Sequence, residues 1–207
     1  MMNYPELLDY RRSVAALYAR TRERDRDAAA QWQEFCLGRD RLFQTHPQSP
    51  LSDAQQACFT GLRYYDYDPA LRFVLAVDTA VEPDVLEIDL RHDGLLRLQR
   101  FGKIHFSIED QAVALSLFWV LGYGGGIFLP FRDLTSGHET YGGGRYLLDT
   151  IKHADLGQEG AQLVIDFNYA YNPSCAYNSR WDCPLAPAEN WLPVTVRAGE
   201  QYALAAA

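Results

Sequence analysis

Apolar and polar residues alternate with a period of two along most of the chain after Leu71. The stretches VLEIDL (85–90) and KIHFSIE (103–109) each place their apolar residues on one face and their polar residues on the other. This alternation is typical of strands that bury one face. The predicted strands cover residues 71–79, 85–91, 95–101, 103–109, 112–121, 126–131, 145–151, 162–168 and 191–197.

Turn signals separate these strands by only a few residues. His92, Asp93 and Gly94 form one such signal, and Gly102 forms another. A parallel pair would need a crossover of about a dozen residues, so neighbouring strands are predicted to be antiparallel. Closing or strongly bending the sheet would protect its edges. The sequence therefore predicts a mainly β (α+β) fold with an antiparallel barrel-like or strongly bent sheet.

Helical periodicity is confined to the start of the chain. Helices are predicted at 5–21 and 26–44, with a short one from Ser52 to Phe59. We expect these two to three helices to pack on the sheet, and the charged run at 20–27 to be a solvated linker. One domain (1–207) is predicted, with a helical segment at 1–60 and a β body at 61–200.

The charge of the chain limits its partners. Net charge is -8. The first 45 residues hold eight Lys/Arg and seven Asp/Glu, whereas the rest holds eleven and twenty. An acidic body without a basic stripe argues against nucleic acid or an anionic membrane as partner, but allows a neutral or cationic small ligand. With no apolar run long enough to span a bilayer and no visible targeting segment, a soluble, cytoplasmic protein is predicted.

Two polar segments interrupt the apolar pattern. The glycine-rich segment (131–146) combines charged side chains with Gly137 and Gly142–Gly144, which allow tight turns. One interpretation is a bulged hairpin with Asp133 and Arg145 paired across its base. The other is a ligand loop in which Arg145 binds a carboxylate or phosphate.

The asparagine–cysteine segment (166–190) begins as a strand. Asp166 and Asn168 share one strand face there, so both can enter one cavity. Pro173 forces Asn172 out of the helical region and starts an irregular loop. This loop either satisfies its own polar groups or presents them to a ligand. We expect the two segments to face each other across one polar pocket.

The two segments resemble a bacterial and archaeal family, domain of unknown function 1684. In the glycine-rich segment the matching residues are Phe131, Asp133, Thr135, Gly137, Thr140, Tyr141, Gly142, Gly144, Arg145 and Tyr146. In the other segment they run from Asp166 to Tyr177, followed by Cys183-Pro184. The resemblance, which covers about three quarters of the chain, implies a shared pocket but no particular activity. His138 departs from the family pattern, so a mechanism based on it would be particular to this protein.

The late cysteines allow several readings. Cys175 and Cys183 are separated by seven residues, whereas zinc knuckles favour two to four. No cofactor or metal site is predicted, although zinc with His138 and Glu139, or with His153, is an alternative. A disulfide and inert packing are others. A catalytic Cys175 would need a lowered thiol pKa.

These observations give three functional hypotheses. The first is a small-molecule enzyme of hydrolase, lyase or cyclase type, and the second is a non-catalytic binding module. The third is a structural or partner-binding protein, and a homo-oligomer is left open. The predicted catalytic residues are Asp133, Glu139, Cys175 and His138. The predicted ligand-binding residues are Arg132, Tyr141, Arg145, Asp166, Asn168, Tyr171, Asn172 and Tyr177.

Overall fold

Three helices begin the chain, as predicted. The computed structural model describes residues 3–23, 26–91 and 94–202. The helices are α1 (Tyr4–Thr21), α2 (Ala28–Thr45) and α3 (Asp53–Ala57). The side chains of Asn3, Asp27 and Ser52 cap their first turns by accepting backbone N–H bonds. Of the charged run at 20–27, residues 24 and 25 lie outside the described part of the chain.

Eight strands follow, in two antiparallel sheets. One sheet has the order β1–β8–β7 and the other the order β2–β3–β4–β5–β6. Their bounds are Arg72–Leu75 (β1), Asp84–Leu90 (β2), Gly94–Ile108 (β3), Gln111–Val120 (β4), Ile127–Phe131 (β5), Arg145–Asp149 (β6), Gln158–Glu159 (β7) and Gln162–Asp166 (β8). The mainly β fold class is therefore confirmed.

Isolated bridges connect the two sheets. Asp78, beyond β1, exchanges two backbone hydrogen bonds of 2.8 Å with Lys103 of β3. Tyr146 of β6 pairs in the same way with Tyr171, beyond β8. Neither sheet closes on itself among the described strands, so a closed barrel is not found.

Two predicted strand assignments need correction. Gly102 does not separate two strands, because β3 runs through it and only a β-bulge interrupts its register with β4 there. A turn and a bulge both favour glycine, so the sequence signal was ambiguous. The turn residues His92 and Asp93 lie outside the described residues.

The second correction concerns 191–197, which forms no ladder. Its backbone instead makes single bonds to residues 132–134: Leu192 N donates to Arg132 O, and Leu134 N donates to Val194 O. Pro193, which has no N–H, also prevents a continuous ladder. The segment therefore lies irregularly against the start of the glycine-rich segment.

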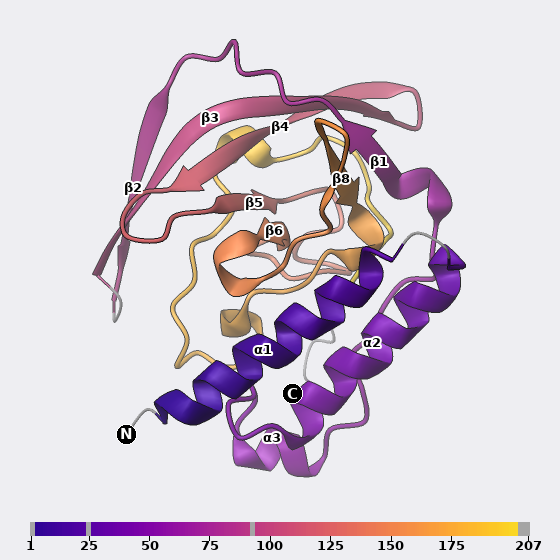
Figure 1. Cartoon of the computed structure of the whole chain (residues 1–207), viewed down its shortest axis with the longest axis vertical. Helices are drawn as coiled ribbons and strands as arrows, with labels where there is room; N and C mark the ends of the chain where they lie inside the picture. Colours follow the sequence, from indigo (N-terminus) through magenta and orange to yellow (C-terminus); the bar gives the residue numbers. More distant parts are fainter. Residues whose placement is uncertain (1–2, 24–25, 92–93, 203–207) are drawn as a thin grey trace.

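The main core lies between the sheets. Its fully buried members include Ile104, Leu117, Phe131 and Phe167. A second cluster joins the helices to the small sheet, with Tyr18 and Phe35 packed near Val164 and Tyr169. Figure 1 shows α1 and α2 side by side across one flank of the β structure.

No helix in the described ranges is both long enough and apolar enough to cross a bilayer.

Candidate functional site

Asp133 and Arg145 form a buried ion pair across the base of the glycine-rich segment. Arg145 Nη2 lies 3.3 Å from Asp133 Oδ1, and both side chains are almost fully buried. Asp133 also accepts bonds from Thr135 and from Val196 N at 2.8 Å. This is the hairpin-base interpretation of the sequence, in which both residues hold the chain together.

The rest of the Arg145 guanidinium binds the C-terminal part of the chain. It donates to the carbonyl oxygens of Val196, Ala198 and Glu200. Gly199, with φ of +75°, lets the chain turn between the last two, and a Cβ there would lie 2.6 Å from Phe167 O. Burial lowers the pKa of Arg145, and Asp133 opposes that shift. Apart from Nε, which has no hydrogen-bond partner among the described residues, Arg145 is occupied by its own protein.

Glu139 lies at the surface and pairs with a residue that the sequence did not suggest. Arg197 binds both of its carboxylate oxygens, at 2.9 and 2.7 Å, and the Tyr65 hydroxyl donates to it at 3.0 Å. These bonds, first from Arg197 and then from Tyr65, lower the pKa of Glu139 to about 2. The pairing with Arg145 or Tyr141 that the sequence suggested is wrong. Glu139 is therefore an ionised carboxylate engaged with an arginine.

His138 and Arg132 lie near these pairs without joining them. His138 is exposed, and its backbone N–H completes the turn by donating to Thr135 O. The Arg132 guanidinium stacks over the Trp191 ring, 4.4 Å from its centroid.

Cys175 and Cys183 meet in a pocket that both predicted segments line, which we call the thiol pocket. The Tyr141 hydroxyl, from the glycine-rich segment, lies 3.6 Å from Cys175 Sγ, and Cys175 N donates to Cys183 Sγ at 3.4 Å. The pocket has a volume of about 280 Å³. It is lined by Arg91, Tyr141, Cys175, Ser179, Trp181, Asp182, Cys183 and Leu185.

Short-range bonds hold the walls of the thiol pocket. The Trp181 indole donates to Pro50 O at 2.9 Å, and the Arg180 guanidinium stacks over its ring. Asp182 accepts a bond from the backbone N–H of Arg91, at the end of β2. The loop is thus fixed to the N-terminal segment on one side and to the large sheet on the other.

The two thiols differ in acidity. A hydrogen bond with Cys183 lowers the pKa of Cys175 to about 7; burial opposes the shift and the Tyr141 hydroxyl supports it. The same thiol–thiol bond, together with burial, raises the pKa of Cys183. Burial also raises the pKa of Tyr141, which therefore stays protonated. The pair titrates as a unit, with the first proton leaving near neutrality.

The other cysteine readings have less support. All four cysteines are free thiols. Among the described residues, no group of three or more His, Cys, Asp or Glu is placed to hold a metal ion. Cys36 differs from Cys175, because burial raises its pKa to about 12.

Tyr171, Asn172 and Tyr177 surround a second buried ion pair. Arg39 of α2 binds Glu200 at 2.8 Å, and Glu200 also accepts from Asn172 N and the Tyr177 hydroxyl. The three predicted residues also line a cavity of about 120 Å³ between the helices and the loop. The sequence analysis missed Arg39 and Glu200. The one available signal was Arg39, a charge on the otherwise apolar stripe of α2.

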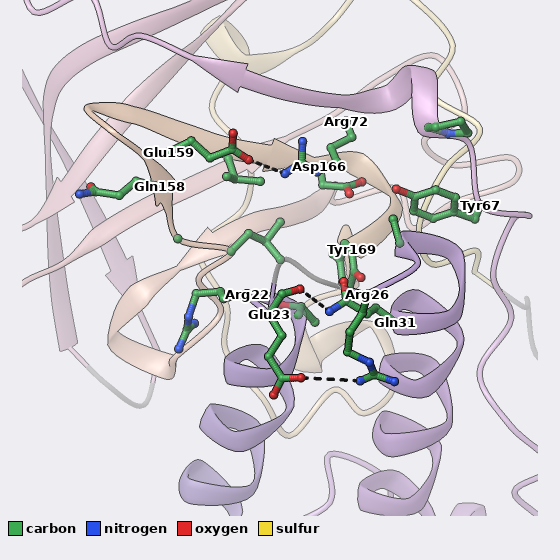
Figure 2. A pocket seen from close by; sticks show the side chains of 16 residues that line it. Arg22, Glu23, Arg26, Gln31, Tyr67, Arg72, Gln158, Glu159, Asp166 and Tyr169 are labelled. Carbon is green, nitrogen blue, oxygen red and sulfur yellow. Dashed lines mark hydrogen bonds and ion pairs between the residues drawn. The ribbon is translucent and has the colours of Figure 1, made fainter.

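Asp166 and Asn168 lie elsewhere, next to the N-terminal helices. Asn168 is buried and fully used: it bonds Asp68 N, Asp68 O and Asp166 Oδ1 at 2.8 Å each. Asp166 lines a cavity of about 450 Å³, shown in Figure 2, which we call the Asp166 cavity. Burial raises the pKa of Asp166 to about 6, against the bonds from Asn168 and the charge of Arg72.

The predicted site is therefore divided. The two segments do meet, at Tyr141, Cys175 and Cys183. The other predicted residues belong to the Asp133–Arg145 pair, the Glu139–Arg197 pair, the surroundings of Glu200, or the Asp166 cavity.

These features define a mainly β protein with a helical flank, in which buried ion pairs hold long loops and two thiols share a pocket. The chain belongs to the family described as protein of unknown function (DUF1684), whose model matches residues 57–201. It is also similar to an uncharacterised protein of Haloarcula marismortui with a solution NMR structure. The two chains are 34% identical, with a TM-score of 0.59, over 83% of this chain and 92% of the other. No curated protein matches this chain.

Proposed function

We propose that this protein is a small-molecule enzyme that uses the Cys175 thiol as nucleophile in the thiol pocket. The observation that carries the proposal is the placement of Cys175 in that pocket, in contact with both Tyr141 and Cys183. A thiolate is the reactive form of cysteine, and a neighbouring hydrogen-bond donor stabilises it. With its pKa near 7, Cys175 is largely ionised at neutral pH, while Tyr141 keeps its proton.

Of the three reaction types that the sequence leaves open, hydrolysis fits this arrangement best. The thiolate would attack the carbonyl carbon of a small ester or thioester and form an S-acyl bond. The leaving alkoxide or thiolate would take a proton from Tyr141. Water would then cleave the S-acyl bond, releasing the acid and regenerating the thiol. Asp133 and Glu139 have no acid–base role in this scheme, because arginines already bind them.

The proposal extends to the setting of the site. Its free thiols suit the cytoplasm, where reductants keep cysteines reduced. The bridges Asp78–Lys103 and Tyr146–Tyr171 support a barrel-like arrangement of the two sheets around the core.

Alkylation with iodoacetamide across pH 5–9, followed by peptide mass spectrometry, tests the nucleophile. We expect the rate at Cys175 to be half-maximal near pH 7, about 1.5 units below a free thiol such as glutathione. Cys183→Ala should move this midpoint upward by the largest amount, and Tyr141→Phe by less, because each removes a hydrogen bond to the thiolate. The exposed Cys58 serves as an internal control for reagent access.

Turnover is tested with small p-nitrophenyl esters and thioesters. An S-acyl adduct should accumulate on Cys175, and Cys175→Ala should abolish hydrolysis. A Cys175 that reacts no faster than glutathione at pH 7, with hydrolysis unchanged in Cys175→Ala, would contradict the proposal.

A non-catalytic binding module is the second candidate. It is favoured by Trp181 and Tyr141, two aromatic side chains that line the pocket. It predicts ligands that bind wild type and Cys175→Ala equally and are never converted.

A further inference from the structure

The Asp166 cavity has a chemistry different from that of the thiol pocket. It lies where α1 and α2 approach the small sheet, and is lined by side chains from both. Figure 2 shows Asp166 beside Arg72, with the hydroxyl end of Tyr67 pointing toward it and Glu23 and Arg26 on the helical side. A volume of about 450 Å³ is in the range of small-molecule sites.

The three arginines that line the cavity are engaged by protein acceptors. Arg22 donates to Asp155 O at 2.6 Å, and Arg72 donates to Glu159 at 2.9 Å. Arg26 binds both carboxylate oxygens of Glu34. Their charge is thus largely neutralised, which disfavours a site for an anion.

Asp166 is the acidic counterpart that retains bonding capacity. The residue is 3% exposed, and both bonds from Asn168 go to the same oxygen, Oδ1, at 2.9 and 2.8 Å. Among the described residues no hydrogen bond to the second oxygen is found. Tyr67 and Tyr169 add aromatic rings to the same cavity, and such rings attract organic cations.

We propose that the Asp166 cavity binds a small organic primary amine, whose ammonium group pairs with the Asp166 carboxylate between Tyr67 and Tyr169. The ammonium group would donate to the free carboxylate oxygen and supply the positive charge that this buried group lacks. The amine's apolar part would lie against the tyrosine rings. This site is separate from the thiol pocket, and no covalent step is involved.

Binding at this site is coupled to the protonation of Asp166. The charged or titratable groups facing it are Arg72 from β1, Glu159 from β7, Tyr67 ahead of the 3-10 turn Pro69–Leu71, Tyr169, and Glu23 and Arg26 from the helical side. Since the Asp166 pKa is about 6, an amine that needs the ionised carboxylate binds more weakly in acid. Its apparent Kd should be about tenfold higher at pH 5 than at pH 8, because only about a tenth of Asp166 is then ionised.

Isothermal titration calorimetry on the full chain tests the proposal. The probes are n-butylamine, benzylamine and 1,4-diaminobutane, with 1-butanol and benzyl alcohol as neutral counterparts. We expect saturable binding of at least one amine at pH 8, and affinity at least tenfold weaker for the matching alcohol. At pH 6 in two buffers of different ionisation enthalpy, the heats should show release of about half a proton.

Two variants localise the binding. Asp166→Asn keeps an oxygen for Asn168 and should weaken amine binding at least tenfold at pH 8, with a flat pH profile. Glu87→Gln, which removes an exposed carboxylate of β2, is the matched control and should bind as wild type does. Circular dichroism confirms folding, and the wild-type pH profile needs no variant.

The proposal is overturned by any of three results: no saturable binding of any amine, alcohols that bind as tightly as amines, or a folded Asp166→Asn protein with unchanged affinity. Cys175→Ala should leave amine binding unchanged, so the outcome is independent of the thiol chemistry.

Discussion

Asp133 and Glu139 each pair with an arginine, but one pair is buried and the other is exposed. Asp133→Asn would leave the Arg145 guanidinium buried without its counter-charge, which costs about 3–5 kcal/mol of unfolding free energy. Glu139→Gln would break a pair that water already screens, so its effect on stability should be several-fold smaller. Urea denaturation of the two variants measures both changes. Equal losses would show that Asp133 is not the structural partner of Arg145.

The sequence could suggest the Asp133–Arg145 pair because the two residues are only twelve positions apart. The acceptors that complete the Arg145 shell, Val196 and Ala198, are more than fifty positions further along the chain. Backbone carbonyl oxygens carry no side-chain signature. For that reason a ligand-binding arginine and a structural one look identical in the sequence.

Gly102 acts at the level of a whole strand. A Cβ at this position would lie 2.5 Å from Val77 Cγ1 and 3.1 Å from Asp78 O, beside the bridge that joins the two sheets. Gly102→Ala should therefore cost about 1–3 kcal/mol of unfolding free energy, as overpacking does. Hydrogen exchange at the Asp78 and Lys103 amides should become faster.

Val77→Ala provides the control for Gly102, because it removes the closest of the clashing atoms. In a double-mutant cycle, the cost of Gly102→Ala should be smaller in the Val77→Ala background than in wild type. Strict additivity would mean that the two residues do not compete for space.

Strand prediction succeeded where alternation and pairing agree. The register of β2 with β3 buries one face, and the predicted bounds of β2 differ from the observed ones by one residue at each end. It failed at 191–197, where the composition is strand-like but the partner, residues 132–134, is a loop. Alternation reports which residues are buried, and it does not report whether a partner strand is present.

At the scale of the whole molecule, the two motif segments met as predicted, yet their polar residues serve different places. The contact of Tyr141 with Cys175 could be anticipated, because one shared pocket was expected. The Asp166 cavity could not be, because α1 and α2 line it and nothing in the sequence places helices from the first 45 residues beside residue 166. The packing of Tyr18 and Phe35 against Val164 and Tyr169 determines that contact.

Two carboxylates with opposite pKa shifts predict how the stability of the whole molecule depends on pH. The folded-state pKa of Asp166 is about 6, above the unfolded value of about 3.9, so its contribution is complete below about pH 4 and is lost as pH rises through 6. The folded-state pKa of Glu139 is about 2, so its contribution is present above about pH 4.3 and is lost as pH falls toward 2.

Asp166→Asn should remove the loss of stability between pH 4 and pH 7. Relative to wild type, the variant should gain about 2–3 kcal/mol of unfolding free energy over that interval, because two pKa units correspond to roughly that energy. Glu139→Gln should instead leave this interval unchanged and flatten the decline below pH 4. Urea denaturation at half-unit pH steps, without added amine, gives both profiles. A wild-type stability that rises steadily from pH 4 to pH 7, with Asp166→Asn running parallel to it, would mean that Asp166 is ionised in the folded protein at pH 4. It would also remove the basis for the pH-dependence of amine binding.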